Sequence, residues 1–94
     1  MQWTWDPDKN RINQRKHYLS FETAQFVFDD PLAASRPDTG SEEERWQTIG
    51  NVGGVVIMVV HTSRGEEDDA APGRIISARR ATQNERRAYE EGDY

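Results

Sequence analysis

The chain has 94 residues and a formal net charge of −5, a length that suits a single domain over residues 1–94. It has no cysteine and no apolar run long enough to span a membrane, and residues 1–6 lack the features of a signal peptide. The composition therefore excludes a disulfide framework and a membrane-spanning helix, and we expect a cytoplasmic protein.

The apolar residues are few but concentrated. Leu, Ile, Val and Phe make up only 17% of the chain, a level near that of disordered proteins. Nine of these sixteen residues lie between residues 49 and 76, so the centre of the chain can form one dense apolar unit.

The first third of the chain predicts a strand and two helices. Residues 2–5 alternate polar and aromatic side chains, as a half-buried strand does. Asp6 and Pro7 predict the start of a helix over residues 8–17, which is almost wholly polar and so belongs at the surface. Ser20 predicts the start of a second helix, which the Asp-Pro step at residues 30–31 ends. Its apolar stripe, which we assign to the core, comprises Phe21, Ala24, Val27 and Phe28.

The rest of the chain predicts a sheet and a last helix. The expected elements are a short strand (32–35), a mobile loop (36–44), a strand (45–49), a turn (50–54), a strand (55–60) and a strand (74–79). The run at 55–60 is apolar on both faces, which is typical of a central strand covered on both sides. Thr82 and Glu85 form a capping box that predicts a helix over residues 82–91. The order β-α-α-β-β-β-β-α predicts a small α+β domain with a mainly antiparallel, twisted sheet.

Positive charge collects near the end of the chain. Residues 74–89 contain five arginines and one glutamate, whereas residues 66–69 are all acidic. Arginines gathered in an acidic protein usually contact phosphate or a partner's carboxylates. Strand alternation predicts that Ile75, Ser77 and Arg79 point to one face and Arg74, Ile76, Ala78 and Arg80 to the other. We favour phosphate binding over a surface ion pair for Arg79, and leave Arg74 evenly balanced between the two.

Two histidines are candidates for chemistry. Lys16 and His17 end the first predicted helix, where cations also interact favourably with the helix dipole, and the residues alone favour that structural role. His61 closes a strand and is interpreted as a satisfied core or edge histidine. Neither the histidines nor the acidic run has the spacing of a metal site, so we expect neither metal nor cofactor.

Residues spread over nearly the whole length resemble the BrnT toxins. In the first half they are Trp5-Asp6, Lys9, Asn13, Lys16-His17, Ser20-Phe21-Glu22, Ala24, Val27-Phe28 and Asp30. In the second half they are Glu44-Arg45, Ile49-Gly50, the run from Arg74 to Arg79, Glu85-Arg86 and Tyr89. The resemblance implies a RelE-like fold and a ribonuclease that blocks translation. It also implies neutralisation by a BrnA-type antitoxin. That antitoxin has a ribbon-helix-helix DNA-binding domain, through which the toxin-antitoxin pair represses its own promoter.

The resemblance assigns roles to the candidate residues. It makes His17 an acid or base at the ribose, because histidine titrates near neutral pH, with Lys16, Arg64 and Arg79 stabilising charge on the phosphate. Such a metal-independent attack should leave a 2′,3′-cyclic phosphate. The expected RNA-binding residues are Arg45, Arg74 and Arg80, and the expected antitoxin-binding residues are Arg86 and Arg87.

Three departures and two alternatives accompany this reading. One departure is the overall acidity, which argues against tight binding to naked RNA. BrnT relatives usually have glycine after the Lys-His pair, where this chain has Tyr18. The acidic loop 65–73 leads to the hypothesis that it tempers RNA affinity when no antitoxin is bound. One alternative is a non-catalytic interaction protein on the same scaffold, either a toxin with another target such as gyrase or an inactive co-repressor. The other is a small binding domain unrelated to toxins.

Overall fold

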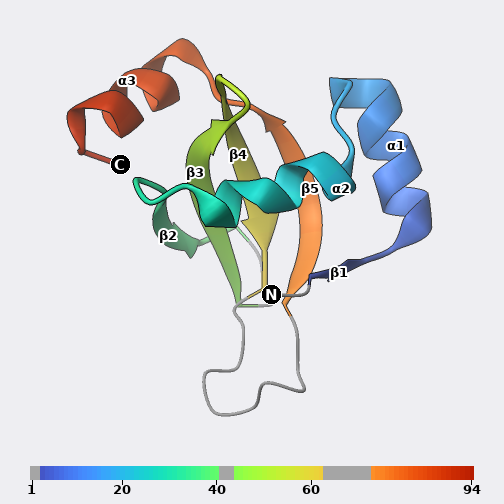
Figure 1. Cartoon of the computed structure of the whole chain (residues 1–94). Helices are drawn as coiled ribbons and strands as arrows, with labels where there is room; N and C mark the ends of the chain where they lie inside the picture. The colour runs from blue at the N-terminus through green and yellow to red at the C-terminus, as the bar shows by residue number, and fades with distance from the viewer. Residues whose placement is uncertain (1–2, 41–43, 63–72) are drawn as a thin grey trace.

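The computed structural model describes residues 3–40, 44–62 and 73–94. In chain order the elements are β1 (Thr4–Trp5), α1 (Pro7–His17), α2 (Phe21–Ala24), the 3₁₀ helix η1 (Gln25–Asp29), β2 (Ala34–Asp38), β3 (Arg45–Val52), β4 (Val55–His61), β5 (Arg74–Arg80) and α3 (Gln83–Glu91). The strands form one sheet in the order β1-β5-β4-β3-β2 (Figure 1). Because β1 runs parallel to β5 while the other neighbours are antiparallel, this α+β chain has a mixed sheet.

The helices begin where the sequence predicts. The Asp6 carboxylate accepts a hydrogen bond from the Asp8 N–H at 2.8 Å, and the Ser20 hydroxyl accepts one from the Thr23 N–H at 3.1 Å. The second helix is less regular than expected, because only its first turn is α-helical and it continues as the 3₁₀ helix η1. It ends at Asp29, since the residue before Pro31 is driven out of helical conformation.

The short strand predicted at residues 32–35 is misplaced. β2 starts at Ala34 and extends to Asp38, into residues predicted to be a mobile loop. Leu32 instead lies in an exposed turn, where its N–H donates to the Asp30 carboxylate at 2.9 Å. β2 tolerates Pro37 because it is an edge strand, paired only with β3 in the described sheet.

The turn between β3 and β4 is tighter than the predicted turn at 50–54. Val52 pairs with Val55, so the loop consists of Gly53 and Gly54 alone. Both glycines have positive φ, 60° and 91°, which a two-residue hairpin turn requires and other residues adopt with strain.

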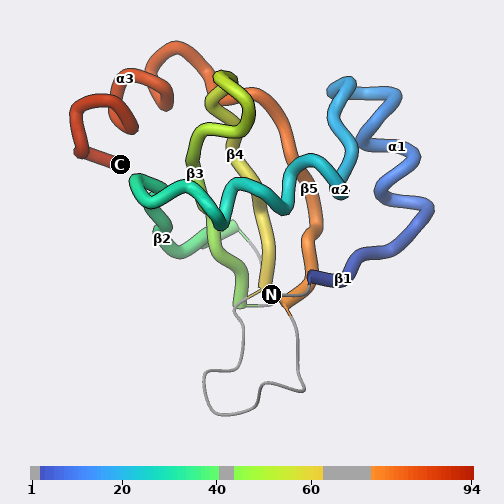
Figure 2. The backbone as a smooth tube through the Cα atoms, in the orientation of Figure 1, coloured from blue at the N-terminus to red at the C-terminus, as the bar shows by residue number. Residues whose placement is uncertain are grey.

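The main core lies between one face of the sheet, here called the helix face, and α2 with η1 (Figures 1 and 2). Its fully or almost fully buried members are Phe21, Ala24, Val27, Ile57, Val59, Ile75 and Ala78. On the opposite face, here called the second face, Ile49 and Met58 pair with each other and are also buried, and α3 contacts β3. β4 is therefore a central strand, as predicted, whereas its second face is buried at Met58 and only half-buried at Val56 and Val60.

An aromatic cluster closes the base of the core. The ring of Trp3 stacks on Phe28 with centroids 4.0 Å apart, and both rings make T-shaped contacts with His61. Gly73 makes this close approach possible, because a Cβ atom at that position would lie 2.3 Å from the Trp3 ring.

A β-bulge corrects the predicted alternation along β5. His61 pairs with Ile75, and Val60 pairs with Ser77, so Ile76 is an extra residue in β5. Ile75 consequently shares the helix face with Ala78, and of the three residues predicted to share one face, Ser77 and Arg79 lie on the second face. The bulge keeps Ile75 in the core while Arg79 remains on the side that α3 approaches.

No helix in the described part of the chain is long and apolar enough to cross a membrane.

Candidate functional site

Asn13 joins α1 to the last part of β5. Its amide Nδ2 donates to the Ala78 carbonyl at 2.8 Å, and its Oδ1 accepts from the Ala78 N–H at 3.2 Å. The same Nδ2 also donates to the Leu19 carbonyl at 2.8 Å. Because Lys16 and His17 lie one helical turn after Asn13, this contact brings the end of α1 beside the end of β5.

A second asparagine, Asn10, joins α1 to α2. Its Oδ1 accepts from the Phe21 N–H at 2.9 Å, and its Nδ2 donates to Glu22 at 2.7 Å. Asn10 and Asn13 are the buried residues of α1, whereas the aliphatic Ile12 is 57% exposed. The sequence prediction missed these anchors, although two asparagines three positions apart in a surface helix are a signal, since asparagine is a poor interior helix former.

The ends of α1 and β5 border one hollow of about 560 Å³. Its lining residues are Lys16, His17, Tyr18, Arg79, Arg80, Ala81 and Thr82. The structure therefore brings together three of the predicted catalytic residues, Lys16, His17 and Arg79, with the predicted RNA-binding residue Arg80. A lysine, two arginines and an imidazole in one open hollow are suited to an anionic ligand.

Tyr18 ends α1 in the manner of a glycine. Its φ and ψ are 56° and 36°, and its N–H donates to the Gln14 carbonyl at 2.9 Å. The left-handed conformation costs a non-glycine residue about 1 to 2 kcal/mol. The backbone turn that a glycine would make at the end of α1 is thus present here, and the side chain of Tyr18 is 90% exposed.

Arg79 forms a two-point ion pair with Glu85 of α3. Its Nη1 and Nη2 donate to the two carboxylate oxygens at 2.7 and 2.9 Å, and the side chains are 34% and 18% exposed. Glu85 also accepts from the Thr82 N–H as the second half of the capping box. These hydrogen bonds, that of Arg79 foremost, lower the pKa of Glu85 to about 2, and Glu85 in turn raises the pKa of Arg79. The sequence left two alternatives for Arg79, phosphate binding or a surface ion pair. The ion pair exists, and its partner is Glu85 of α3.

The other predicted RNA-binding arginines lie at the far end of the sheet. Arg74 begins β5, about 20 Å of strand from Arg80. Arg45 begins β3, which runs in the same direction as β5, and lies opposite Asp38 in the strand register of β2 and β3. Arg64 and the acidic run 66–69 lie outside the described residues, so the hypothesis about the acidic loop stays a prediction.

The predicted antitoxin-binding residues are on α3. Arg86 and Arg87 are exposed, and Arg86 lines a separate hollow of about 450 Å³ together with Arg80. Their exposure leaves both guanidinium groups accessible to a partner.

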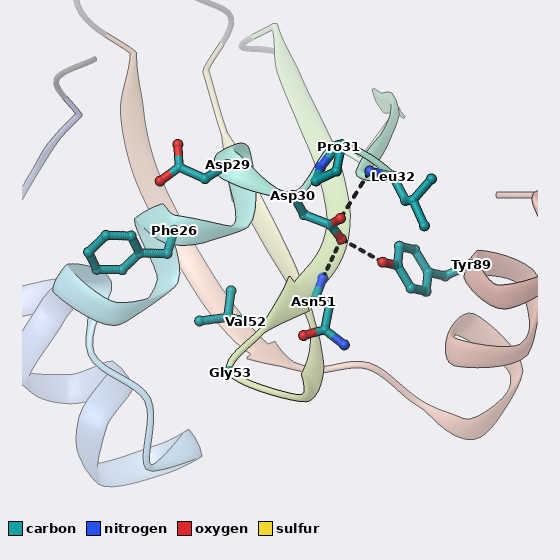
Figure 3. Close-up of a pocket in the computed structure, with 9 residues that line it drawn as sticks. All are labelled: Phe26, Asp29, Asp30, Pro31, Leu32, Asn51, Val52, Gly53 and Tyr89. Carbon is teal, nitrogen blue, oxygen red and sulfur yellow. Dashed lines mark hydrogen bonds between the residues drawn. The ribbon is translucent and has the colours of Figure 1, made fainter.

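A third hollow, of about 560 Å³, surrounds the Asp30 carboxylate (Figure 3). Asp30 Oδ2 accepts from the Tyr89 hydroxyl at 2.5 Å and from the Asn51 N–H at 2.7 Å. The shared hydrogen bond lowers the pKa of Asp30 and raises the pKa of Tyr89 to about 12. With Asp29 beside it, this hollow is acidic, and Asp30 serves to fasten α3 to β3 rather than to hold an anion.

His61 is a satisfied core histidine, as its position predicts. It is 6% exposed, its Nε2 lies 2.6 Å from the Thr48 hydroxyl, and its Nδ1 lies 2.8 Å from the Thr62 carbonyl. Because Nδ1 must donate to that carbonyl, Nε2 accepts from Thr48. Burial lowers the pKa of His61 and thus favours the neutral imidazole. Within the described ranges, no three His, Cys, Asp or Glu side chains cluster as they would around a metal ion.

Comparison with known proteins gives one family. A family model described as "Ribonuclease toxin, BrnT, of type II toxin-antitoxin system" matches residues 5–85. The matched range includes both ends of the hollow, α1 with Lys16 and His17 and β5 with Arg79 and Arg80, and stops before Arg86. No protein of curated function matches the chain significantly. Since the family model covers most of the sequence, the chain belongs to the BrnT family of ribonuclease toxins from type II toxin-antitoxin systems.

Proposed function

We propose that this chain cleaves RNA without a metal ion, in the hollow between the ends of α1 and β5. The observation that carries the proposal is the convergence of Lys16, His17, Arg79 and Arg80 from two segments more than sixty positions apart on one open hollow. Imidazole and cations are the groups that such a cleavage needs.

The proposed reaction starts at the ribose 2′-hydroxyl. A base removes its proton, the 2′-oxygen attacks the adjacent phosphorus, and the bond from phosphorus to the 5′-oxygen breaks. The leaving 5′-oxygen takes up a proton, and a 2′,3′-cyclic phosphate remains. His17 serves as base or acid, and Lys16 and Arg80 stabilise the charge that builds on the phosphoryl oxygens.

Arg79 has a double role in this proposal. Its Nη1 and Nη2 hold Glu85, which fixes α3 against β5, and the same guanidinium borders the hollow. A guanidinium has five N–H donors. Two of those of Arg79 bind Glu85 and a third donates from Nη1 to the Arg80 carbonyl at 3.2 Å, which leaves Nε–H and one N–H of Nη2 for a phosphate. The proposal includes Arg64 as a further cation that stabilises charge on the phosphate.

The proposal extends to the cellular setting of the activity, which membership of the family supports. The chain acts as a RelE-like toxin domain in the cytoplasm, where RNA cleavage stops translation. A BrnA-type antitoxin with a ribbon-helix-helix domain neutralises it, contacts Arg86 and Arg87, and carries the pair to operator DNA. Arg45 and Arg74 hold phosphates that flank the cleaved one on a longer RNA.

Substitutions in the hollow test the proposal. His17→Ala is expected to reduce the rate of RNA cleavage about 10²- to 10⁴-fold, the usual contribution of a general acid or base. Lys16→Ala should lower the rate as well, whereas Arg15→Ala, an exposed cation on the same helix, should leave it unchanged. EDTA should not alter the rate, and the products should end in 2′,3′-cyclic phosphate. Equal cleavage by the wild type, His17→Ala and Lys16→Ala would overturn the proposal.

The Arg79–Glu85 ion pair favours a second function. A guanidinium that is already held at two points is partly neutralised, which suits an inactive co-repressor or a toxin that binds a target other than RNA. In that case the purified chain leaves RNA intact with and without EDTA, yet still binds its antitoxin or inhibits growth.

A further inference from the structure

A second cluster of planar side chains lies on the second face of the sheet, away from the hollow. Arg36 of β2 places its guanidinium carbon 4.3 Å from the ring centroid of Tyr94, which follows α3. The Tyr94 hydroxyl donates to Gln47 Oε1 of β3 at 3.0 Å, and Arg36 Nε donates to the same oxygen at 3.2 Å. The guanidinium plane of Arg36 and the side-chain amide of Gln47 together hold the ring of Tyr94.

This cluster shares its face with Arg79. Strand pairing puts Gln47 opposite Val60 and Ser77, and puts Met58 opposite Arg79 in the next row. Gln47 and Arg79 are therefore on the same side of the sheet, two strands and two residues or about 12 Å apart. The charges of Arg79 and Glu85 also act on the Tyr94 phenol, whose pKa burial raises.

The cluster has the chemistry of a base-binding site. Single-stranded RNA is recognised by stacking of a base on an aromatic ring or an arginine plane and by hydrogen bonds to the base edge. Arg36 supplies the plane, and Gln47 supplies an acceptor and a donor, since its Nε2 now donates to Asp38 at 3.2 Å. Phosphate fits the place poorly, because the Asp38 carboxylate stands beside Gln47.

We infer that Arg36 and Gln47 form a subsite for a nucleobase of the RNA, and that Tyr94 occupies this subsite when no RNA is bound. The inference rests on the proposed function and deepens it, because it separates the recognition of a neighbouring base from cleavage in the hollow. RNA then displaces the Tyr94 ring, and the base takes its place on Arg36.

Binding of a short RNA with 2′-deoxy linkages, which cannot be cleaved, tests the inference by fluorescence anisotropy. A matched control oligonucleotide has the same backbone, but the nucleotides that flank the linkage bound in the hollow lack their bases. Arg36→Ala should weaken binding of the intact oligonucleotide about three- to thirty-fold, the range of a cation on a ring, and leave the abasic one unchanged. Tyr94→Ala should tighten the intact one about three- to ten-fold, as expected when a competing ring is removed.

Controls separate the two kinds of contact. Lys16→Ala should weaken both oligonucleotides equally, because it acts through phosphate, and Arg11→Ala, exposed on the outer side of α1, should change neither. Titration of the wild type with adenosine 5′-monophosphate should shift the NMR signals of the Gln47 side-chain amide. The shift of that signal measures binding of a nucleotide at the subsite and does not depend on RNA cleavage.

Each result decides one question. If Arg36→Ala weakens the intact and abasic oligonucleotides equally, or if Tyr94→Ala has no effect, the base subsite is wrong even where His17-dependent cleavage stands. If Arg36→Ala weakens antitoxin binding and leaves RNA binding intact, the cluster belongs to the protein partner and the inference is overturned. If the wild type neither binds nor cleaves RNA, the proposed function itself fails.

Discussion

Single amide side chains place the residues of the hollow. Asn13 satisfies the backbone of Ala78, a residue 65 positions away in the sequence, and thereby fixes where Lys16 and His17 stand. A thin apolar core leaves much of the tertiary specificity to such buried hydrogen bonds, which are costly to leave unmade.

Replacement of Asn13 by alanine is expected to destabilise the fold by about 2 to 4 kcal/mol, because the Ala78 N–H and C=O lose their partners in a buried place. Chemical unfolding measures the change. RNA cleavage should fall with it even below the unfolding transition, since His17 loses its support. Ile12→Ala, a change at an exposed position of the same helix, should cost well under 1 kcal/mol. A similar cost for both variants would show that Asn13 does not anchor α1.

Tyr18→Gly should stabilise the protein by about 0.5 to 1 kcal/mol. The change removes the strain of a left-handed tyrosine, and the greater freedom of glycine in the unfolded chain offsets part of that gain. Thermal unfolding would record it as a rise in Tm. Tyr18→Ala, which keeps the strain but loses the exposed ring, should show no comparable rise. Equal Tm values for Tyr18→Gly and the wild type would contradict a strained helix end.

Two polar contacts hold α3 on the sheet. The Arg79–Glu85 ion pair joins its first turn to β5, and the hydrogen bond from Tyr89 to Asp30 joins its second half to the loop before β2. α3 has no fully buried residue, so these contacts supply much of what positions it. Whatever alters the charge of Glu85 should therefore loosen α3.

The pH dependence of stability should reveal that ion pair. The pKa of Glu85 is about 2 in the folded chain and near 4.5 in the unfolded one, so its contribution is complete above pH 4.5 and is lost as the pH falls to about 2. After allowance for solvent screening, Glu85→Gln should lower the free energy of unfolding by about 1 to 2 kcal/mol at pH 7. The difference between variant and wild type should vanish near pH 2. Glu90→Gln, at an exposed position of the same helix, is the matched control. A constant difference from pH 7 to pH 2 would rule out this ion pair as the cause.

Local signals predicted the helices well and the edge of the sheet poorly. Asp6, Ser20 and Thr82 cap their helices through contacts within three residues, and a pattern in the sequence can contain such contacts. The start of β2 and the bulge in β5 depend instead on register against strands far along the chain.

The same division applies to the candidate site. Lys16 and His17 were suggested by the family resemblance, and Arg79 by the cluster of arginines. Their meeting in one hollow depends on the contact between Asn13 and Ala78, which no local pattern contains. Glu85 could have been predicted from the sequence as the partner of Arg79, since it is half of the predicted capping box.

The whole molecule is acidic, with a net charge of −5, while the cations of the hollow are few and grouped. Such a protein gains little from long-range attraction to RNA, so under the proposed function its affinity for RNA comes from contacts inside the hollow. Arg45 and Arg74, at the other end of the sheet, can add to them only for an RNA long enough to reach.

The salt dependence of RNA binding should therefore grow with RNA length. For a short RNA that fills the hollow, about three phosphate contacts predict a slope of log K against log salt near −2, and for a longer RNA about five predict one near −3.5. Fluorescence anisotropy between low and moderate salt measures both slopes on uncleavable RNA. Arg74→Ala should flatten the slope for the long RNA only, whereas Lys16→Ala should flatten both. Identical slopes for the two lengths would leave Arg45 and Arg74 without a role in binding.

Asn13 also governs how the sheet ends. β1 covers only the first residues of β5, and the amide of Asn13 takes the N–H and C=O of Ala78 that a further strand would use. At the opposite border, Pro37, the fourth residue of β2, has no N–H to offer a neighbour. Strand addition is thus hindered at both borders, so we expect a second copy or an antitoxin to recognise this protein through its side chains rather than by extending its sheet.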